Sequence, residues 1–120
     1  MKILICGSRF YTDYNKILQY VRSLKDAAIN ESIVIIAGGA RGADTLAVKA
    51  AIACGFPFRE YPAQWEKYGK KAGPIRNQTM LDMERPDIVA AFHEAIESSK
   101  GTKDMVARAK KSSVPVVVFN

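Results

Sequence analysis

Short apolar runs alternate with segments of helical periodicity along the whole chain. Five runs rich in β-branched residues are typical of strands, and they lie at residues 2–6, 33–37, 56–61, 87–92 and 114–119. Between these runs, apolar positions recur every three or four residues, as on one face of a helix. One such stripe comprises Ile17, Leu18, Val21, Leu24 and Ala28, and another comprises Met105, Val106 and Ala109.

This alternation predicts the fold class. Strands joined through helices pair in parallel by right-handed crossovers, and strands that are apolar throughout indicate a sheet covered on both faces. We expect one Rossmann-like α/β domain over residues 1–120, a three-layer sandwich with a five-stranded parallel sheet in the order 3-2-1-4-5. A helix is predicted at residues 43–54, one long polar loop at residues 62–73, and another helix beginning at Pro74.

The amino-acid composition is typical of a packed domain, and the net charge limits the classes of partner. The 120 residues are 48% hydrophobic and 25% charged, a balance that excludes an intrinsically disordered chain. Met1 leads into a short apolar run that breaks at Gly7, so we expect a cytoplasmic protein that does not enter a membrane. Cys6 and Cys54 lack the spacing of metal ligands and are expected to be reduced core residues. The net charge of +6 favours anionic partners without distinguishing nucleotides, nucleic acids and acidic proteins.

Two turns that follow predicted strands carry glycine and arginine. Ligands of parallel sheets bind beyond the carboxyl ends of the strands, where the strand order reverses. The first turn offers a tight bend, a hydroxyl and a cation, in Gly7, Ser8 and Arg9. The second runs directly into a predicted helix, whose N-terminal amides favour a phosphate; it comprises Gly38, Gly39, Ala40, Arg41, Gly42, Ala43 and Asp44.

A third turn, at residues 98–104, also combines hydroxyls, a glycine and lysines before a helix. Each turn alone is equally compatible with an ordinary helix cap. The three together, on one edge of the sheet, favour a ligand site. Asp44 would repel a phosphate, so we expect it to contact a sugar hydroxyl, to stabilise the helix dipole, or both.

Four motifs of the chain resemble the SLOG superfamily, and within it the small YspA-like branch related to YpsA. They are the turns at residues 7–9, 38–44 and 99–104, and residues 72–78 together with Met80. The superfamily also includes the lonely-guy phosphoribohydrolases and DprA. The resemblance implies a Rossmann-like fold, a site for a nucleotide or its derivative, and a homodimer, and it adds Arg76 and Asn77 to the site.

The resemblance also bears on catalysis. Lonely-guy enzymes carry a Gly-Gly-x-Gly-Thr-x-x-Glu motif, which this chain matches only at Gly101 and Thr102. The position of the glutamate falls on Met105, with Asp104 one residue earlier. Asp44 and Asp104 are therefore the candidate catalytic carboxylates.

The leading hypothesis is a domain that binds or senses a nucleotide-derived ligand: ADP-ribose-like, NAD-derived or a nucleoside monophosphate. The expected ligand residues are Gly7, Ser8, Arg9, Gly38, Gly39, Arg41, Gly42, Asp44, Arg76, Asn77, Ser99, Gly101 and Thr102. We expect neither a metal nor a resident cofactor, since the metal-ligand motifs are absent from the sequence.

Two other functions stay open. One is a phosphoribohydrolase-like enzyme that cleaves an N-glycosidic bond. The other is a nucleic-acid module related to DprA, which would use the basic segment at residues 67–76. Trp65 and Tyr68 either stack on a base or, in the case of Trp65, anchor a loop against the core. His93, the single histidine, is a weak candidate for proton transfer.

Overall fold

The computed structural model describes residues 1–28 and 31–120 and contains one five-stranded parallel sheet. Its strands are β1 (Lys2–Gly7), β2 (Val34–Ala37), β3 (Phe58–Glu60), β4 (Ile88–Phe92) and β5 (Val116–Phe119). The sheet order is β3-β2-β1-β4-β5, as predicted. In the central strand, Leu4 pairs with Ile36 of β2 on one side and with Val89 of β4 on the other.

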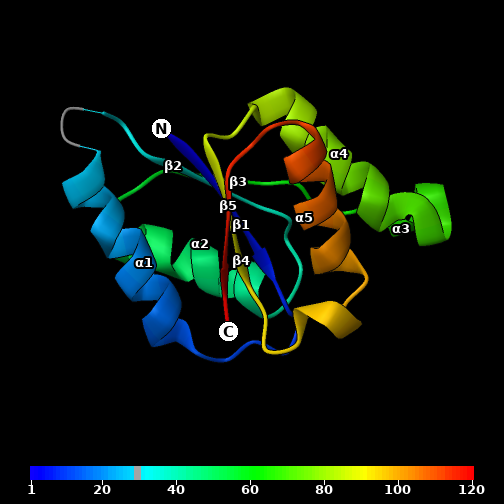
Figure 1. Cartoon of the computed structure of the whole chain (residues 1–120), viewed down its shortest axis with the longest axis horizontal. Coiled ribbons are helices and arrows are strands. Elements are labelled where there is room, and N and C mark those ends of the chain that lie inside the picture. Colours follow the sequence, from blue (N-terminus) through cyan, green and yellow to red (C-terminus); the bar gives the residue numbers. More distant parts are fainter. Residues whose placement is uncertain (29–30) are drawn as a thin grey trace.

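Helices cover both faces of this sheet (Figure 1). The main helices are α1 (Tyr14–Ala27), α2 (Ala43–Cys54), α4 (Ala72–Glu84) and α5 (Gly101–Lys111). Side chains of a strand alternate between its two faces, so Ile3 and Ile5 pack with α1 and α2, whereas Leu4 and Cys6 pack with α4 and α5. The three-layer sandwich is confirmed.

The edge strands differ from the prediction of strands that are apolar and buried throughout. All three residues of β3 are exposed, and this strand is shorter than the predicted run at residues 56–61. In β5, Val117 and Val118 are 39% and 49% exposed. The two strands lie at the margins of the sheet, where each has a single neighbour, so burial on both faces holds only for the central strands.

The prediction of one long loop at residues 62–73 is wrong. The segment instead contains a short helix, α3 (Trp65–Tyr68), then the 3-10 turn η1 (Gly69–Lys71), and α4 begins at Ala72 rather than at Pro74. Pro74 lies in the first helical turn, where its missing N–H removes no intrahelical bond. A second 3-10 turn, η2 (Ile96–Ser98), precedes α5.

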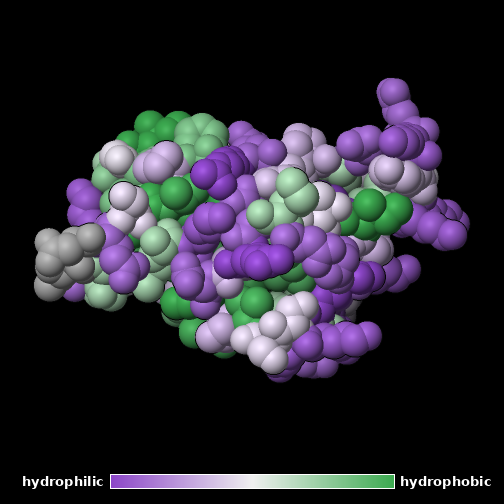
Figure 2. All heavy atoms as spheres, turned by 90° about the horizontal axis from the view of Figure 1, so that it is seen from above, coloured by the Kyte–Doolittle hydropathy of each residue, from purple (hydrophilic) through white to green (hydrophobic). Residues whose placement is uncertain are grey.

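The end of the molecule that carries the amino ends of the strands is shown in Figure 2. Hydrophilic side chains cover most of the middle of this face, and apolar side chains form separate patches. None of the helices in the described residues is long and apolar enough to cross a membrane. Cys6 and Cys54 are both free and buried.

Candidate functional site

The turns after β1 and β2 are in direct contact at the carboxyl edge of the sheet. The Ala43 N–H, in the first turn of α2, donates to the Ser8 carbonyl oxygen at 3.0 Å. A Cβ atom at Gly42 would overlap the Ser8 carbonyl oxygen, and one at Gly7 would overlap the Phe92 carbonyl oxygen. Glycine is therefore required at both positions so that the two backbones can approach.

Asp44 lies inside the glycine turn that precedes it. Its side chain is 6% exposed, and its Oδ2 accepts a hydrogen bond from the Ala40 N–H at 3.1 Å. Burial raises the pKa of the Asp44 carboxyl to about 6, although the Ala40 N–H and the nearby Arg76 guanidinium act in the opposite direction. The Asp44 carboxyl group thus occupies part of the turn after β2, whose backbone amides were predicted from the sequence to bind a phosphate.

Arg76, on α4, reaches across the carboxyl end of β2. Its Nη1 donates to the carbonyl oxygens of Gly38 and Tyr61, and its Nε donates to Asn77 Oδ1 at 3.0 Å. A Cβ atom at Gly38 would collide with this guanidinium. Gly38, Asp44, Arg76 and Asn77 are called the Arg76 cluster below.

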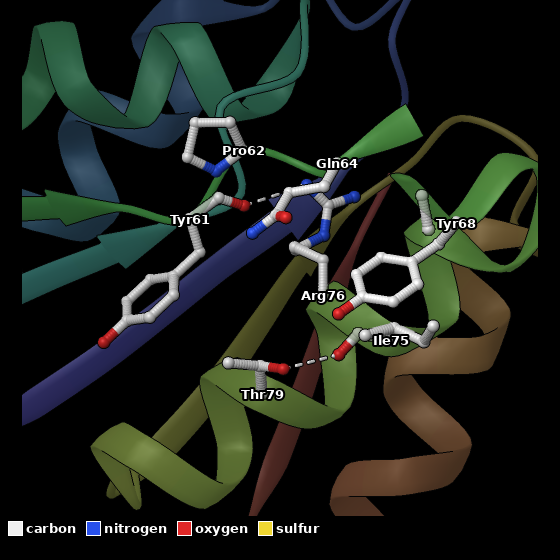
Figure 3. A pocket seen from close by; sticks show the side chains of 8 residues that line it. Tyr61, Pro62, Gln64, Tyr68, Ile75, Arg76 and Thr79 are labelled. Carbon is white, nitrogen blue, oxygen red and sulfur yellow. Dashed lines mark hydrogen bonds between the residues drawn. The ribbon is translucent and has the colours of Figure 1, made fainter. Parts of the chain in front are cut away.

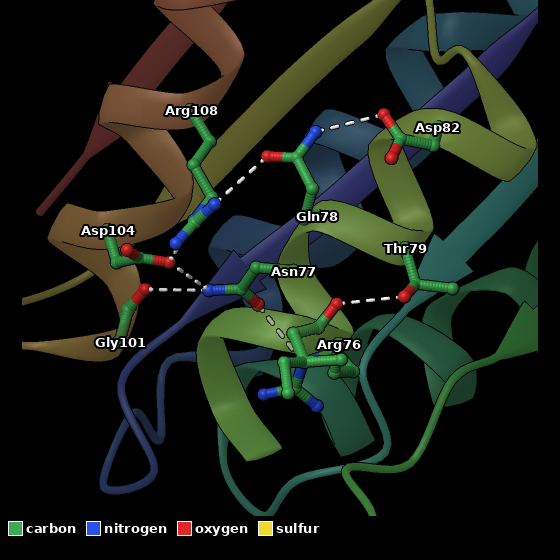
Figure 4. Close-up of polar contacts among 9 residues, drawn as sticks. Arg76, Asn77, Gln78, Thr79, Asp82, Gly101, Asp104 and Arg108 are labelled. Atoms are coloured by element: carbon green, nitrogen blue, oxygen red, sulfur yellow. Dashed lines mark hydrogen bonds and ion pairs between the residues drawn. The ribbon is translucent and has the colours of Figure 1, made fainter. Parts of the chain in front are cut away.

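Asn77 connects this cluster to the start of α5 (Figure 4). Its side chain is 4% exposed, and Nδ2 donates to the Gly101 carbonyl oxygen at 3.3 Å and to Asp104 Oδ2 at 3.0 Å. The same Asp104 oxygen accepts from Arg108 Nε at 2.8 Å, and Arg108 Nη1 donates to Gln78 Oε1 at 3.0 Å. Asp104 is therefore engaged on two sides by other side chains.

The third turn joins the site at the beginning of α5. Ser99 Oγ accepts from the Lys103 N–H at 3.0 Å, which is the helix-capping role that the sequence left open. Thr102 is buried and Gly101 is exposed. The structure brings Gly101 next to Asn77, while the contacts of Ser99 stay within its own segment.

Arg9 and Arg41 lie apart from the Arg76 cluster, along an open groove of about 520 Å³ between the first turn and the start of α2. Both side chains are exposed, and neither makes an ion pair within residues 1–28 and 31–120. The ring of Phe10 beside them is 79% exposed. This Arg9–Arg41 groove is lined by Arg9, Phe10, Tyr11, Thr12, Arg41, Gly42, Thr45 and Leu46.

Some contacts at this edge were missed by the sequence reasoning. Ser8 Oγ donates to Glu94 Oε1 at 2.7 Å, and it accepts from the Phe10 N–H at 3.0 Å. The hydrogen bond from the Ser8 hydroxyl lowers the pKa of the Glu94 carboxyl. Glu94 follows β4, so its position after a predicted strand was the available signal. His93 Nδ1 accepts from the Ala95 N–H at 2.8 Å, which holds the ring against its own turn.

Trp65 is not anchored in the core. It is 51% exposed on α3 and lies against α4, where a Cβ atom at Gly73 would be 3.5 Å from its ring. Among residues 1–28 and 31–120, no three His, Cys, Asp or Glu side chains are grouped closely enough to hold a metal ion.

Comparison with known proteins identifies a family from the sequence and a shared fold from the structure. Residues 1–68 match YAcAr, the YspA, cpYpsA-related SLOG family. The Gene 61 protein of Mycobacterium phage D29 is 33% identical over 129 residues, which cover 98% of this chain and 95% of the phage protein.

Two solved structures share the fold. DNA processing protein A (DprA) from Streptococcus pneumoniae has a TM-score of 0.73 at 19% identity, and DprA from Helicobacter pylori, described with its single-stranded DNA binding mode, has 0.69 at 18%. Each alignment covers 98% of this chain but only 49% and 64% of the respective DprA chains. At this identity the likeness shows the fold alone.

Proposed function

The chain belongs to the YspA, cpYpsA-related SLOG family, and from this premise we propose that it binds or senses a nucleotide or nucleotide-derived ligand at the carboxyl edge of its sheet. The ligand class is ADP-ribose-like, NAD-derived or a nucleoside monophosphate. The binding residues are those predicted from the three turns together with Arg76 and Asn77. We further propose that the protein acts as a cytoplasmic homodimer.

The proposal depends on one observation: hydrogen bonds within the protein hold the Arg76 guanidinium in a fixed position. Nε and Nη1 are both engaged, by Asn77 and by the Gly38 and Tyr61 carbonyl oxygens, whereas Nη2 donates to none of the described residues. A guanidinium fixed in this way offers its remaining donors to an anion without first losing rotational freedom. The fixed position of this positive charge favours a phosphate contact.

The Arg9–Arg41 groove supports a second anionic contact. The turn after β2 begins at Gly38 in the Arg76 cluster and ends at Arg41 and Gly42 in the groove. A ligand with two phosphates, such as ADP-ribose, can therefore engage both regions along one turn. Arg9 and Arg41, which form no ion pair with the described residues, match the charge of such a ligand.

A thermal-shift panel tests the proposal. AMP, ADP-ribose and NAD at millimolar concentration are expected to raise the melting temperature of the wild-type chain by several degrees for at least one ligand. Arg76→Ala and Arg41→Ala should reduce that shift. Arg22→Ala, at an exposed position on α1, is the matched control and should leave it unchanged. A panel without any shift contradicts the proposal.

Hydrolysis is the second candidate, because Asp44 is a buried carboxyl whose pKa is raised to about 6. Such a group exchanges a proton near neutral pH, as acid–base catalysis requires. The reaction would cleave an N-glycosidic bond and release a free base. Chromatography after incubation with each nucleotide tests it: release that Asp44→Asn abolishes favours the enzyme, and intact nucleotide with saturable binding favours the binding protein.

Nucleic-acid binding is the third candidate, and the basic aromatic surface of α3 and η1 favours it. Trp65 and Tyr68 are 51% and 37% exposed, and the lysines at positions 67, 70 and 71 lie in the same segment. Stacking rings among cations are typical of single-strand binding. Affinity for an oligonucleotide that falls steeply with salt would support this function, and no binding at low salt would contradict it.

A further inference from the structure

A small cleft separates the segment after β3 from α4, beside the Arg76 guanidinium (Figure 3). Its volume is about 120 Å³. At roughly 30 Å³ per water molecule, such a cleft has room for about four waters or one planar ring system, and not for a whole nucleotide. The lining residues used below are Tyr61, Gln64, Tyr68, Arg76 and Thr79.

Two polar groups of the lining are already engaged within the protein. The Tyr61 hydroxyl donates to Glu84 Oε2, and the Thr79 hydroxyl donates to the Ile75 carbonyl oxygen at 2.8 Å. The Gln64 amide and the Tyr68 hydroxyl, in contrast, form no side-chain hydrogen bond with residues 1–28 or 31–120. A glutamine amide presents a donor and an acceptor side by side, which matches the edge of a nucleobase.

The cleft and the glycine turn are joined through one side chain. Arg76 Nη1 bonds to the Gly38 carbonyl oxygen and lies 3.4 Å from the Tyr61 carbonyl oxygen, so its guanidinium spans the ends of β2 and β3. In Figure 3 the Gln64 amide, the Tyr68 ring and the Arg76 guanidinium surround the same space. A ring in the cleft would therefore have its attached sugar and phosphate beside Arg76.

We propose that this cleft holds the base of the nucleotide-derived ligand, an inference that rests on the proposed function. The Tyr68 ring packs against the base, the Gln64 amide bonds to its edge, and Arg76 contacts the phosphate-bearing side. Lys67 Nζ lies 5.1 Å from the Tyr68 ring centroid, and this cation–π contact helps to hold the ring in place. Trp65 is not among the lining residues.

The test compares a probe with a base and a probe without one. Titration calorimetry on the full chain measures the affinities for AMP and for ribose 5-phosphate, and wild type is expected to bind AMP about tenfold more tightly. Tyr68→Leu and Gln64→Ala should each weaken AMP binding about five- to tenfold and leave ribose 5-phosphate binding unchanged. Phe58→Leu is the matched control, because Phe58 is 38% exposed against 37% for Tyr68 and does not line the cleft.

The outcomes separate the two proposals. Equal affinity of wild type for both probes, or AMP binding that neither cleft variant weakens, overturns the base site and leaves the proposed function standing. Weakening of both probes to the same extent by Tyr68→Leu also overturns it, because that result indicates a general distortion. Binding of neither probe overturns the base site, and it contradicts the proposed function as well only if ADP-ribose and NAD also fail to bind.

Discussion

The Arg76 cluster and the Arg9–Arg41 groove both present glycine and arginine at the same edge of the sheet, yet they differ in how the arginines are held. Arg76 is partly buried and donates to three acceptors, and the cluster includes the buried Asp44 and Asn77. Arg9 and Arg41 are exposed and without an ion pair in the described chain. Arginines at the same edge of the sheet therefore differ in energetic role according to whether acceptors of the protein hold them.

The difference has consequences for binding. Arg76 loses its side-chain entropy when the protein folds, so a ligand that meets it finds a group already positioned. Arg9 and Arg41 must be ordered by the ligand, which costs on the order of 0.5–1.5 kcal/mol for each side chain. The cluster is thus expected to set the geometry of binding, and the groove to contribute mainly charge.

The largest effect is expected from the glycines that border the two regions. Gly42 has a φ of 73°, and a Cβ there would overlap backbone atoms of Ser8 and Arg9. Gly42→Ala should lower the free energy of unfolding by about 3 kcal/mol or more. A Cβ at Gly38 would meet mainly the guanidinium of Arg76, so that only the end of a hydrogen-bonded side chain, and not backbone, would have to shift. Gly38→Ala should therefore cost only about 1 kcal/mol, measured by urea unfolding.

Gly42→Ala and Gly38→Ala each serve as the control for the other. If Gly38→Ala is as destabilising as Gly42→Ala, the Arg76 guanidinium cannot move aside and the cluster is as rigid as backbone. A small effect of Gly38→Ala on stability should be accompanied by a loss of AMP binding, because the displaced guanidinium no longer occupies its held position.

The second prediction concerns the buried carboxyl of the cluster. Asp44 has a pKa raised by burial from 3.8 to about 6. The fold favours the neutral carboxyl, so this contribution to stability is fully present below pH 3.8 and is lost as pH rises through about 6. At about 1.4 kcal/mol per pKa unit, wild type should lose about 2.5 kcal/mol more than Asp44→Asn between pH 4 and pH 7.5.

Urea unfolding at the two pH values measures this loss. Asp26→Asn, on the exposed part of α1, corrects for a carboxyl removed elsewhere. Parallel pH profiles for wild type and Asp44→Asn would mean that the Asp44 carboxyl is ionised in the folded protein throughout this range. The proton-exchanging role proposed for Asp44 in hydrolysis would then be lost as well.

The third prediction tests the link between the cluster and α5. Asn77→Ala removes the acceptor of Arg76 Nε and the donor to the Gly101 carbonyl oxygen. Both hydrogen bonds are partly buried, and leaving their groups unpaired costs about 1–3 kcal/mol. Gln78→Ala, the next residue of α4 and only partly buried, should cost about 1 kcal/mol or less. Equal losses in calorimetric or urea unfolding would contradict a special role for Asn77.

Much of the fold was predictable because it depends on local patterns. The apolar runs of the central strands predicted the parallel sheet, and the usual order of this fold class supplied the strand order, which the structure confirms. The stripe that begins at Ile17 correctly marked the buried face of α1. Residues 62–73 were assigned wrongly because the segment is polar and aromatic and because Pro74 is typical of the first position of a helix. In the structure, however, Gly69 ends α3 and Pro74 lies in the first turn of α4.

The candidate site was predictable as a set of residues but not as an arrangement. Glycine turns at strand ends identified the edge, and the chain does bring Gly38, Arg76, Asn77 and Gly101 together. The contact between Asp44 and the Ala40 N–H, and that between Ser8 and Glu94, depends on side-chain direction. Such directions are set by tertiary packing, so sequence periodicity does not encode them.

The smallest effect on stability is expected in the groove. Arg41→Ala removes an exposed side chain that forms no ion pair with residues 1–28 or 31–120, so the free energy of unfolding should change by less than about 0.5 kcal/mol. Binding of ADP-ribose should nevertheless weaken, and more so at low salt, because a contact between exposed charges is screened by ions. Arg41→Lys retains the charge but not the paired donors, and should recover part of the affinity. Unchanged ADP-ribose affinity in Arg41→Ala, together with a large loss in Arg76→Ala, would confine the ligand to the Arg76 cluster.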